Sequence, residues 1–223
     1  MRHSSFVQLR GNEKLAGGFS DWLRGTETSF RSGKGGADVP CGTCNACCRS
    51  SMFIHIRPEE TETIRRIPRA LLFPGPGLPE GHVVMGYDDK GRCPMLFDDK
   101  CSIYEHRPQT CRDYDCRIFA ATGVPVDRQN QPDIARRVGE WVFHYEAEES
   151  REEHASLLEA AAFLQRNKSL FPQGSLPTHP GQLAILAVRV YRMFAGMAAD
   201  AHDDAAIARA ITTVLRATED RTD

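Results

Sequence analysis

All of the cysteines in this chain fall in one segment. Eight cysteines lie between Cys41 and Cys116, and the remaining two-thirds of the 223 residues contain none. The first ten residues have no apolar run, so we expect no secretory signal and a cytoplasmic protein. Thiols stay reduced in such a compartment, where clustered cysteines bind metal more often than they form disulfides. Metal binding is therefore the first interpretation, and a disulfide framework is the weaker alternative.

The first cluster has the spacing C-x2-C-x2-C-C. Two intervening residues allow a tight turn to bring two sulfurs to one tetrahedral ion, and the same spacing serves iron–sulfur clusters. In an extended segment the last two cysteines would point to opposite sides and could serve different centres. In a helix the last three would share a face. The sequence leaves both alternatives open for Cys41, Cys44, Cys47 and Cys48.

The second cluster is more widely spaced and contains Cys93, Cys101, Cys111 and Cys116. Together the eight thiols predict either two four-thiolate sites or one polynuclear cluster plus one zinc. We interpret all eight as one cooperative ligand set, because neither cluster has a complete spacing pattern of its own.

Thiolates are stabilised by nearby cations. Four arginines stand next to the second cluster in the sequence: Arg92, Arg107, Arg112 and Arg117. The alternative is that these arginines pair with Glu105, Asp113 and Asp115 and only hold the loop.

Charge and hydropathy exclude two classes of partner. The 28 basic and 30 acidic residues nearly cancel, so nothing favours binding to nucleic acid or to an anionic membrane. The longest aliphatic run, 183–188, is far shorter than the roughly 20 residues that span a bilayer. We expect a metal ion as the main partner, and leave a protein partner or substrate open.

Composition divides the chain into three regions. Residues 1–40 are expected to hold a short helix over 16–24 and a flexible linker near 31–36. Residues 41–119 form the cysteine-cluster metal-binding module, and residues 120–223 a helical region that packs on it. The predicted fold is mostly α, with a small β-hairpin in the cysteine module.

Local patterns refine that expectation. Residues 52–56 have strand character, and 82–87 and 92–97 are predicted to pair as a hairpin. From residue 130 onward the chain is expected to be helical throughout, with apolar stripes at 3.6-residue spacing that are typical of core. One such helix is expected to begin at Pro180 and another to be capped by Asp203 or Asp204.

These motifs resemble the zinc- or iron-chelating domain family of YkgJ-like CxxCxxCC cysteine-cluster proteins. The resemblance covers residues 41–117 and includes Cys93-Pro94 and the run from Cys101 to Cys116. It implies a cytoplasmic bacterial protein that holds zinc or an iron–sulfur cluster, 4Fe–4S among the options. The bacterial flagellin lysine N-methylase is similar through the same cluster, which implies a methyl-transfer alternative.

Two classes of function follow. The first is a non-catalytic metalloprotein with a structural, redox or metal-handling role, which suits closed all-thiolate sites. The second is a metal-dependent enzyme. It would be a protein lysine N-methyltransferase that uses S-adenosylmethionine, or an iron-dependent oxidoreductase. An open iron site would need histidine or carboxylate ligands, and His55 and His106 lie nearest to the cysteines.

Other polar residues have structural interpretations. Glu140 and His144 would form an i, i+4 pair that either handles protons or only stabilises a helix surface. Tyr104 and Tyr114 flank the cysteines, and we expect them to pack or to bond sulfur rather than to react.

Overall fold

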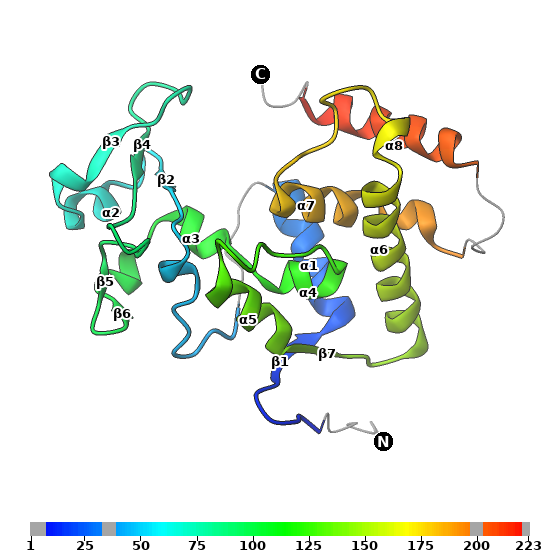
Figure 1. The fold of residues 1–223 in the computed structure, drawn as a ribbon, viewed down its shortest axis with the longest axis horizontal. Helices are drawn as coiled ribbons and strands as arrows, with labels where there is room; N and C mark the ends of the chain where they lie inside the picture. The colour runs from blue at the N-terminus through cyan, green and yellow to red at the C-terminus, as the bar shows by residue number, and fades with distance from the viewer. Residues whose placement is uncertain (1–7, 33–38, 197–202, 220–223) are drawn as a thin grey trace. The chain divides into compact units, whose positions relative to one another are not determined.

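The computed structural model describes residues 8–32, 39–196 and 203–219. Helices dominate this part of the chain, and its strands form only three small sheets, as Figure 1 shows. The mostly α prediction is confirmed. The linker predicted near residues 31–36 falls largely outside the described residues. None of the described helices is long and apolar enough to cross a membrane.

The chain separates into two compact units. The first comprises Met1–Glu27, Arg117–Pro125 and Glu140–Asp223. The second comprises Thr28–Cys116 and Val126–Gly139. All eight cysteines belong to the second unit.

The first unit is mainly helical. Its elements are β1 (Lys14–Gly18), α1 (Phe19–Ser32), whose last residues enter the second unit, α4 (Arg117–Thr122), β7 (Trp141–His144), α6 (Glu148–Arg166), α7 (Pro180–Val190) and α8 (Asp204–Glu219).

The core of the first unit lies between α6 and α7. Leu157 and Leu164 of α6 and Ala184 of α7 are fully buried, as the predicted stripes require. Proline at the first position of α7 fits a helix start, since its missing N–H has no partner there anyway. Asp203 accepts from the amide of Ala206 and caps α8. Both predicted helix starts are confirmed.

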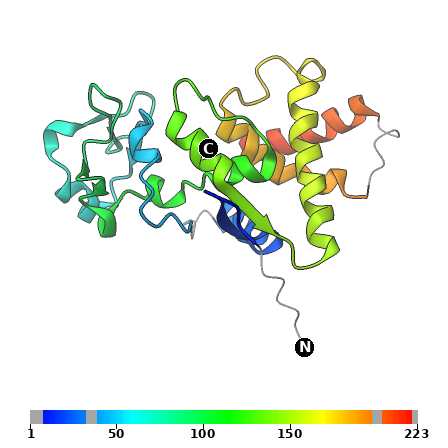
Figure 2. The same cartoon turned by 60° about the horizontal axis from the view of Figure 1, so that its bottom comes forward.

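Residues 141–144 are a strand, so the prediction of helix throughout 130–223 is wrong there. β7 runs parallel to β1, with Lys14 opposite Trp141, and Figures 1 and 2 show the two strands side by side. The side chains of Trp141 and Phe143 are buried and those between are not, which is the two-residue period of a strand. Glu140 and His144 therefore do not form a helical i, i+4 pair.

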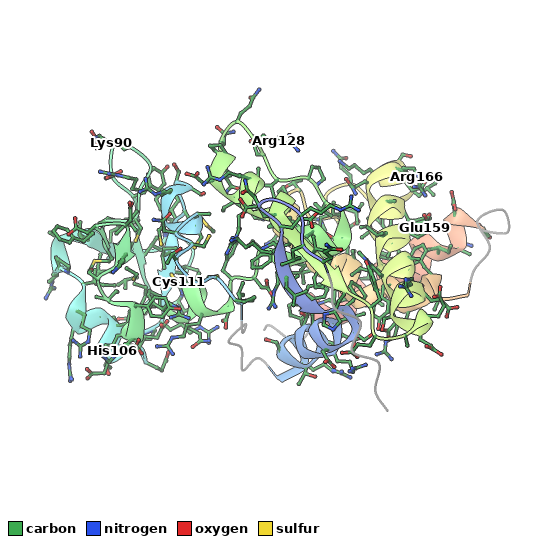
Figure 3. The ribbon with its side chains drawn as sticks, turned by 90° about the horizontal axis from the view of Figure 1, so that it is seen from below. Lys90, His106, Cys111, Arg128, Glu159 and Arg166 are labelled. Carbon is green, nitrogen blue, oxygen red and sulfur yellow. The ribbon has the colours of Figure 1, made fainter. Side chains whose placement is uncertain are left out.

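The helix predicted over 16–24 begins later and continues further, from Phe19 to Ser32. Ala16 and its neighbours are instead drawn into β1 by pairing with β7. The predicted stripe is correct, because Phe19, Trp22 and Leu23 are all buried. On the exposed side of α6, Arg166 and Glu159 form an ion pair of 2.7 Å, labelled in Figure 3.

The second unit contains short elements connected by turns. They are β2 (Ile54–Ile56), α2 (Thr61–Arg66), β3 (Leu72–Pro74), β4 (Val83–Met85), β5 (Leu96–Phe97), β6 (Lys100–Cys101), α3 (Gln109–Asp113) and α5 (Pro132–Glu140), whose last residue falls in the first unit.

The predicted hairpin between 82–87 and 92–97 is wrong. β4 lies between β2 and β3 and pairs antiparallel with both. That arrangement buries Met85 in a small core with Ile54, Ile56 and Ile103. A turn does form at the predicted place, since the amide of Asp88 donates to the carbonyl of Arg92 at 2.8 Å. The module's hairpin is formed instead by β5 and β6.

Candidate metal centre

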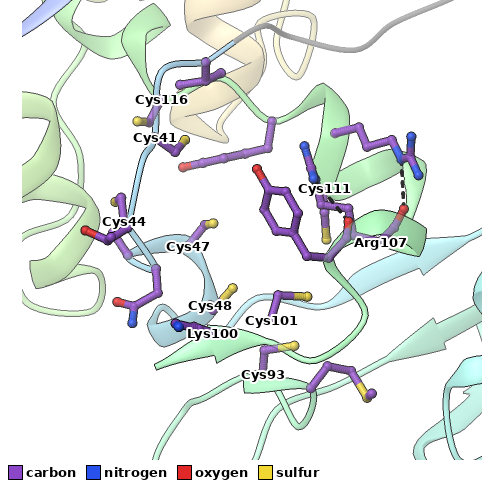
Figure 4. A pocket seen from close by; sticks show the side chains of 18 of the residues that line it. Cys41, Cys44, Cys47, Cys48, Cys93, Lys100, Cys101, Arg107, Cys111 and Cys116 are labelled. Carbon is purple, nitrogen blue, oxygen red and sulfur yellow. Dashed lines mark hydrogen bonds between the residues drawn. The ribbon is translucent and has the colours of Figure 1, made fainter. Parts of the chain in front are cut away.

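The second unit brings all eight cysteines to one pocket. The cavity has a volume of about 510 Å³, and all eight thiols are free of disulfide bonds. Figure 4 shows these side chains around it. The cysteines that line it are Cys41, Cys44, Cys47, Cys48, Cys93, Cys101, Cys111 and Cys116.

A turn and a short 3-10 helix position the first cluster. The amide of Cys44 donates to the carbonyl of Cys41 at 3.0 Å, and Gly42 supplies the positive φ of +57° that the turn needs. Cys47 and Cys48 begin the 3-10 helix η1 (Cys47–Arg49). Neither sequence alternative describes this segment fully, because Cys47 and Cys48 are helical and Cys44 precedes the helix.

Backbone hydrogen bonds join the two clusters. The amide of Cys93 donates to the carbonyl of Cys48 at 2.8 Å, and the amide of Ser51 donates to the carbonyl of Gly91 at 2.9 Å. The long segment between the clusters therefore closes on itself where the two sets of thiols meet.

The second cluster is held by three kinds of element. Cys93 begins a turn that the amide of Leu96 closes at 2.9 Å, and Cys101 in β6 lies opposite Leu96 in β5. Cys111 lies in α3. Cys93, Cys101 and Cys111 all pack against the small core of the second unit, so burial fixes the positions of these three thiols.

Four cationic side chains line the pocket. Arg107 and Arg112 are among those predicted, whereas Lys100 and Arg137 were missed. Arg137, on α5, is buried and donates from Nη2 to the carbonyl of Cys41 at 3.0 Å. Arg112 donates to the backbone oxygens of Arg107 and Glu105, and thus holds the loop while lining the cavity.

The other two predicted arginines lie elsewhere. Arg92 pairs with the carboxylate of Asp88 at 3.0 Å, and Arg117 belongs to the first unit, where it donates to the carbonyl of Ala16 at 2.8 Å. Adjacency in the sequence did not predict which arginines line the pocket, because Arg92 and Arg117 both bond to partners away from the thiols.

Burial keeps several of the thiols neutral. It raises the pKa of Cys41 to about 11 and that of Cys111 to about 12, with further increases from neighbouring cysteines. Burial also raises the pKa of Cys93 and Cys101. A bound cation would reverse this effect, because it stabilises the charged thiolate.

Cys47 and Cys48 behave as a pair. The hydrogen bond between their side chains lowers the pKa of Cys47 to about 7. The same bond, followed by burial, raises the pKa of Cys48. Cys47 is also the exposed member of the eight, so it is the thiol that solvent reaches first.

The remaining predicted residues divide into two groups. Tyr104 and Tyr114 line the pocket, and burial, followed by the charges of Cys116 and Cys47, raises the pKa of Tyr114. His55 and His106 are not among its lining residues. His55 instead pairs with His82, Nε2 to Nδ1 at 2.7 Å, and burial followed by the charges of His82 and Arg57 lowers its pKa.

The donor set suits a soft metal, although the donors are not yet arranged around one. Eight thiols with no disulfide are the ligands that zinc and iron–sulfur clusters prefer. Among the residues the structure describes, no three His, Cys, Asp or Glu side chains converge closely enough to hold an ion. The pocket therefore gathers the donors of both clusters.

Comparison with known proteins agrees with this donor set. Residues 40–131 match the CxxCxxCC family model, whose description is "Putative zinc- or iron-chelating domain". Residues 40–131, which are less than half of the chain, thus resemble a cysteine-cluster domain of the metal-chelating class, and the family model that they match is CxxCxxCC.

The other comparisons add no closer relative. No curated protein and no solved structure matches the chain. The likeness to flagellin lysine N-methylase, and the methyl-transfer and iron-oxidoreductase alternatives that accompany it, stay predictions.

Proposed function

We propose that this chain is a non-catalytic metalloprotein that binds zinc or an iron–sulfur cluster through all eight cysteines. One observation carries the proposal: thiols from two distant segments line a single cavity, and none is used in a disulfide. Thiolate ligands select zinc, copper(I) and iron–sulfur clusters over hard cations. The family match names zinc or iron among these.

The chain's own residues would provide the ligands and balance their charge. Zinc would supply a fixed cross-link between the segments, whereas an iron–sulfur cluster would supply one-electron redox chemistry. Lys100, Arg107, Arg112 and Arg137 would offset the negative charge of the thiolates. Tyr114 would close the cavity beside Cys116 and Cys47.

The role of the metal is structural, redox or metal handling. Sites in which four protein thiolates fill the coordination shell favour a structural role. Cys47 is exposed, however, and gives a bound metal one ligand that solvent and other thiols can reach. That access supports metal exchange, which a handling role needs. Eight reduced thiols also support a reducing compartment such as the cytoplasm.

Anaerobic purification of the full chain tests the proposal directly. Elemental analysis, labile sulfide and the visible spectrum should show either a brown protein with iron and sulfide or a colourless one with zinc. Removal of the metal with a chelator should expose the cysteines to a thiol reagent, while the helices of the first unit stay folded. Protein that carries neither metal, and that takes up neither zinc nor iron after reduction, would refute it.

A further inference from the structure

We infer that the eight thiols form two four-thiolate centres. The inner centre comprises Cys48, Cys93, Cys101 and Cys111, and the outer centre comprises Cys41, Cys44, Cys47 and Cys116. This inference rests on the proposed metal binding and extends it, because it states which thiols share an ion.

The inner centre is defined by packing. Cys93, Cys101 and Cys111 come from a turn, a strand and a helix, yet all three pack against the same core of Ile and Met side chains. Cys48 joins them through its carbonyl, which accepts from the amide of Cys93 at 2.8 Å. Of the eight cysteines, only these three pack against that core, so Cys48 is placed in the inner centre by the backbone bond alone.

The outer centre has its own supports. Cys41 and Cys44 share a tight turn, and Arg137 of α5 holds the carbonyl of Cys41. In Figure 4 the side chains of Cys41 and Cys116 both lie in the part of the pocket away from Cys93. Tyr114 is close enough to both Cys116 and Cys47 to feel their charges.

The short helix η1 separates the two adjacent cysteines. A 3-10 helix has three residues per turn, so neighbouring side chains leave it about 120° apart. Cys47 and Cys48 can therefore serve different centres even though they are adjacent, and the hydrogen bond between their thiols places the boundary of the two centres at this pair. Cys47 lies close enough to interact electrostatically with Cys41 of the outer group and with Cys93, Cys101 and Cys111 of the inner group.

Charge balance favours two ions over one. Eight thiolates bring eight negative charges, of which two divalent ions neutralise four. Four cationic side chains line the pocket beside one carboxylate, that of Asp99, and offset most of the rest. A single divalent ion would leave part of the set to be kept as neutral thiols.

Cobalt(II) titration of the reduced, metal-free full chain tests the assignment, with thiolate-to-cobalt absorption as the readout. The wild type should bind two ions tightly.

Four variants, each with two substitutions, then discriminate between the possible assignments of thiols to centres. Two fall within a centre, Cys48→Ser/Cys101→Ser and Cys44→Ser/Cys47→Ser, and each should keep one tight ion. Two fall across the centres, Cys44→Ser/Cys101→Ser and Cys47→Ser/Cys48→Ser, and should keep none.

The variants control for one another, since each removes two thiols. A cross-centre variant that keeps one tight ion, or a within-centre variant that keeps none while its circular dichroism is native, would overturn the division and leave metal binding intact. X-ray absorption of the zinc-loaded wild type needs no variant. Four sulfurs around each of two zinc ions support two four-thiolate centres, whose members the variants assign, and any other count overturns the inference. A wild type that binds no cobalt, zinc or iron refutes the proposed function itself.

Discussion

The amide N–H of Cys93 donates to the carbonyl oxygen of Cys48 at a distance of 2.8 Å. This bond joins the last cysteine of the first cluster to the first cysteine of the second. Next to it the amide of Ser51 donates to the carbonyl of Gly91 at 2.9 Å. The backbone therefore brings the clusters together without help from a metal, and the two bonds form a joint that can be tested alone.

Gly91→Ala should weaken this joint. Gly91 has a φ of +72°, and an added Cβ would meet Ser51 Oγ at 2.3 Å. Gly77 is the matched control, because its φ is +73° with open space around it. Positive φ costs alanine about 1–2 kcal/mol at either position. We expect Gly91→Ala to lower the free energy of unfolding by about 1 kcal/mol more than Gly77→Ala, as an overpacking cost.

Urea unfolding of the metal-free protein measures this difference. Adding Ser51→Ala should recover most of the excess, because the oxygen that clashes is then absent. Equal losses for Gly77→Ala and Gly91→Ala would show that the joint tolerates the extra methyl group.

Cys47 should be the first thiol to be alkylated in the metal-free protein at pH 7. Its pKa is lowered to about 7 by the hydrogen bond with Cys48, so about half of it is thiolate, against about 1% for a thiol with a pKa near 9. It is also exposed. Mass spectrometry after a brief iodoacetamide pulse should find Cys47 modified before Cys111, whose pKa is about 12.

The control for this experiment is Cys48→Ala, which removes the hydrogen-bond donor. Without the Cys48 thiol, the cause of the lowered pKa is removed and labelling of Cys47 should slow. Metal loading should protect Cys47 in the wild type. Labelling of Cys47 no faster than that of Cys111 would contradict the prediction.

Sequence periodicity was a good guide to helix surfaces and a poor one to strand partners. The stripe of Phe19, Trp22 and Leu23 is buried as expected, because an amphipathic helix is encoded within a few turns. β1 pairs with β7, more than a hundred residues away in sequence. No local pattern specifies such a partner, and for the same reason β4 was assigned to the wrong neighbour.

The residues of the pocket likewise divide into those that the sequence predicts and those that it does not. Clustering and spacing were enough to single out all eight cysteines, which the structure brings to one cavity. Arg137 gave no such signal, since an arginine in an amphipathic helix is ordinarily a solvated residue. Its role depends on how α5 packs within the second unit, where it reaches the carbonyl of Cys41.

The metal-free protein should lose stability as the pH rises from about 9 to 12. In the unfolded chain a thiol ionises near its ordinary pKa of 9.0, but burial raises the pKa of Cys41 to about 11 and that of Cys111 to about 12. Below pH 9 both states keep the proton and stability is full. Above it the unfolded chain loses protons that the folded chain keeps, so ionisation favours unfolding.

Urea midpoints at pH 8, 10 and 11 measure this dependence. Lysine and tyrosine also titrate in that range, so metal-free Cys111→Ser is the control, and it should show a shallower decline. Identical slopes for the two proteins would contradict a raised pKa at Cys111. Metal-loaded wild type should be less sensitive than either, because its bound thiols are already deprotonated.

Arg137→Met should destabilise the second unit, whereas Arg136→Met should not. Arg137 is buried and donates to the carbonyl of Cys41 at 3.0 Å. Arg136 is next to it on α5, but 69% of its side chain is exposed and it forms an ion pair with Asp133. A hydrogen bond from a charged group contributes about 1.5–3 kcal/mol, and an exposed ion pair less than about 1 kcal/mol. Methionine keeps much of the apolar stem, so the comparison isolates the guanidinium.

Urea unfolding should therefore separate the free energies of unfolding of the two variants by about 1–2 kcal/mol. Zinc titration should show weaker binding for Arg137→Met alone, because Cys41 then loses the contact that fixes its backbone. Equal stability and equal zinc affinity for the two variants would mean that Arg137 only fills space beside the pocket.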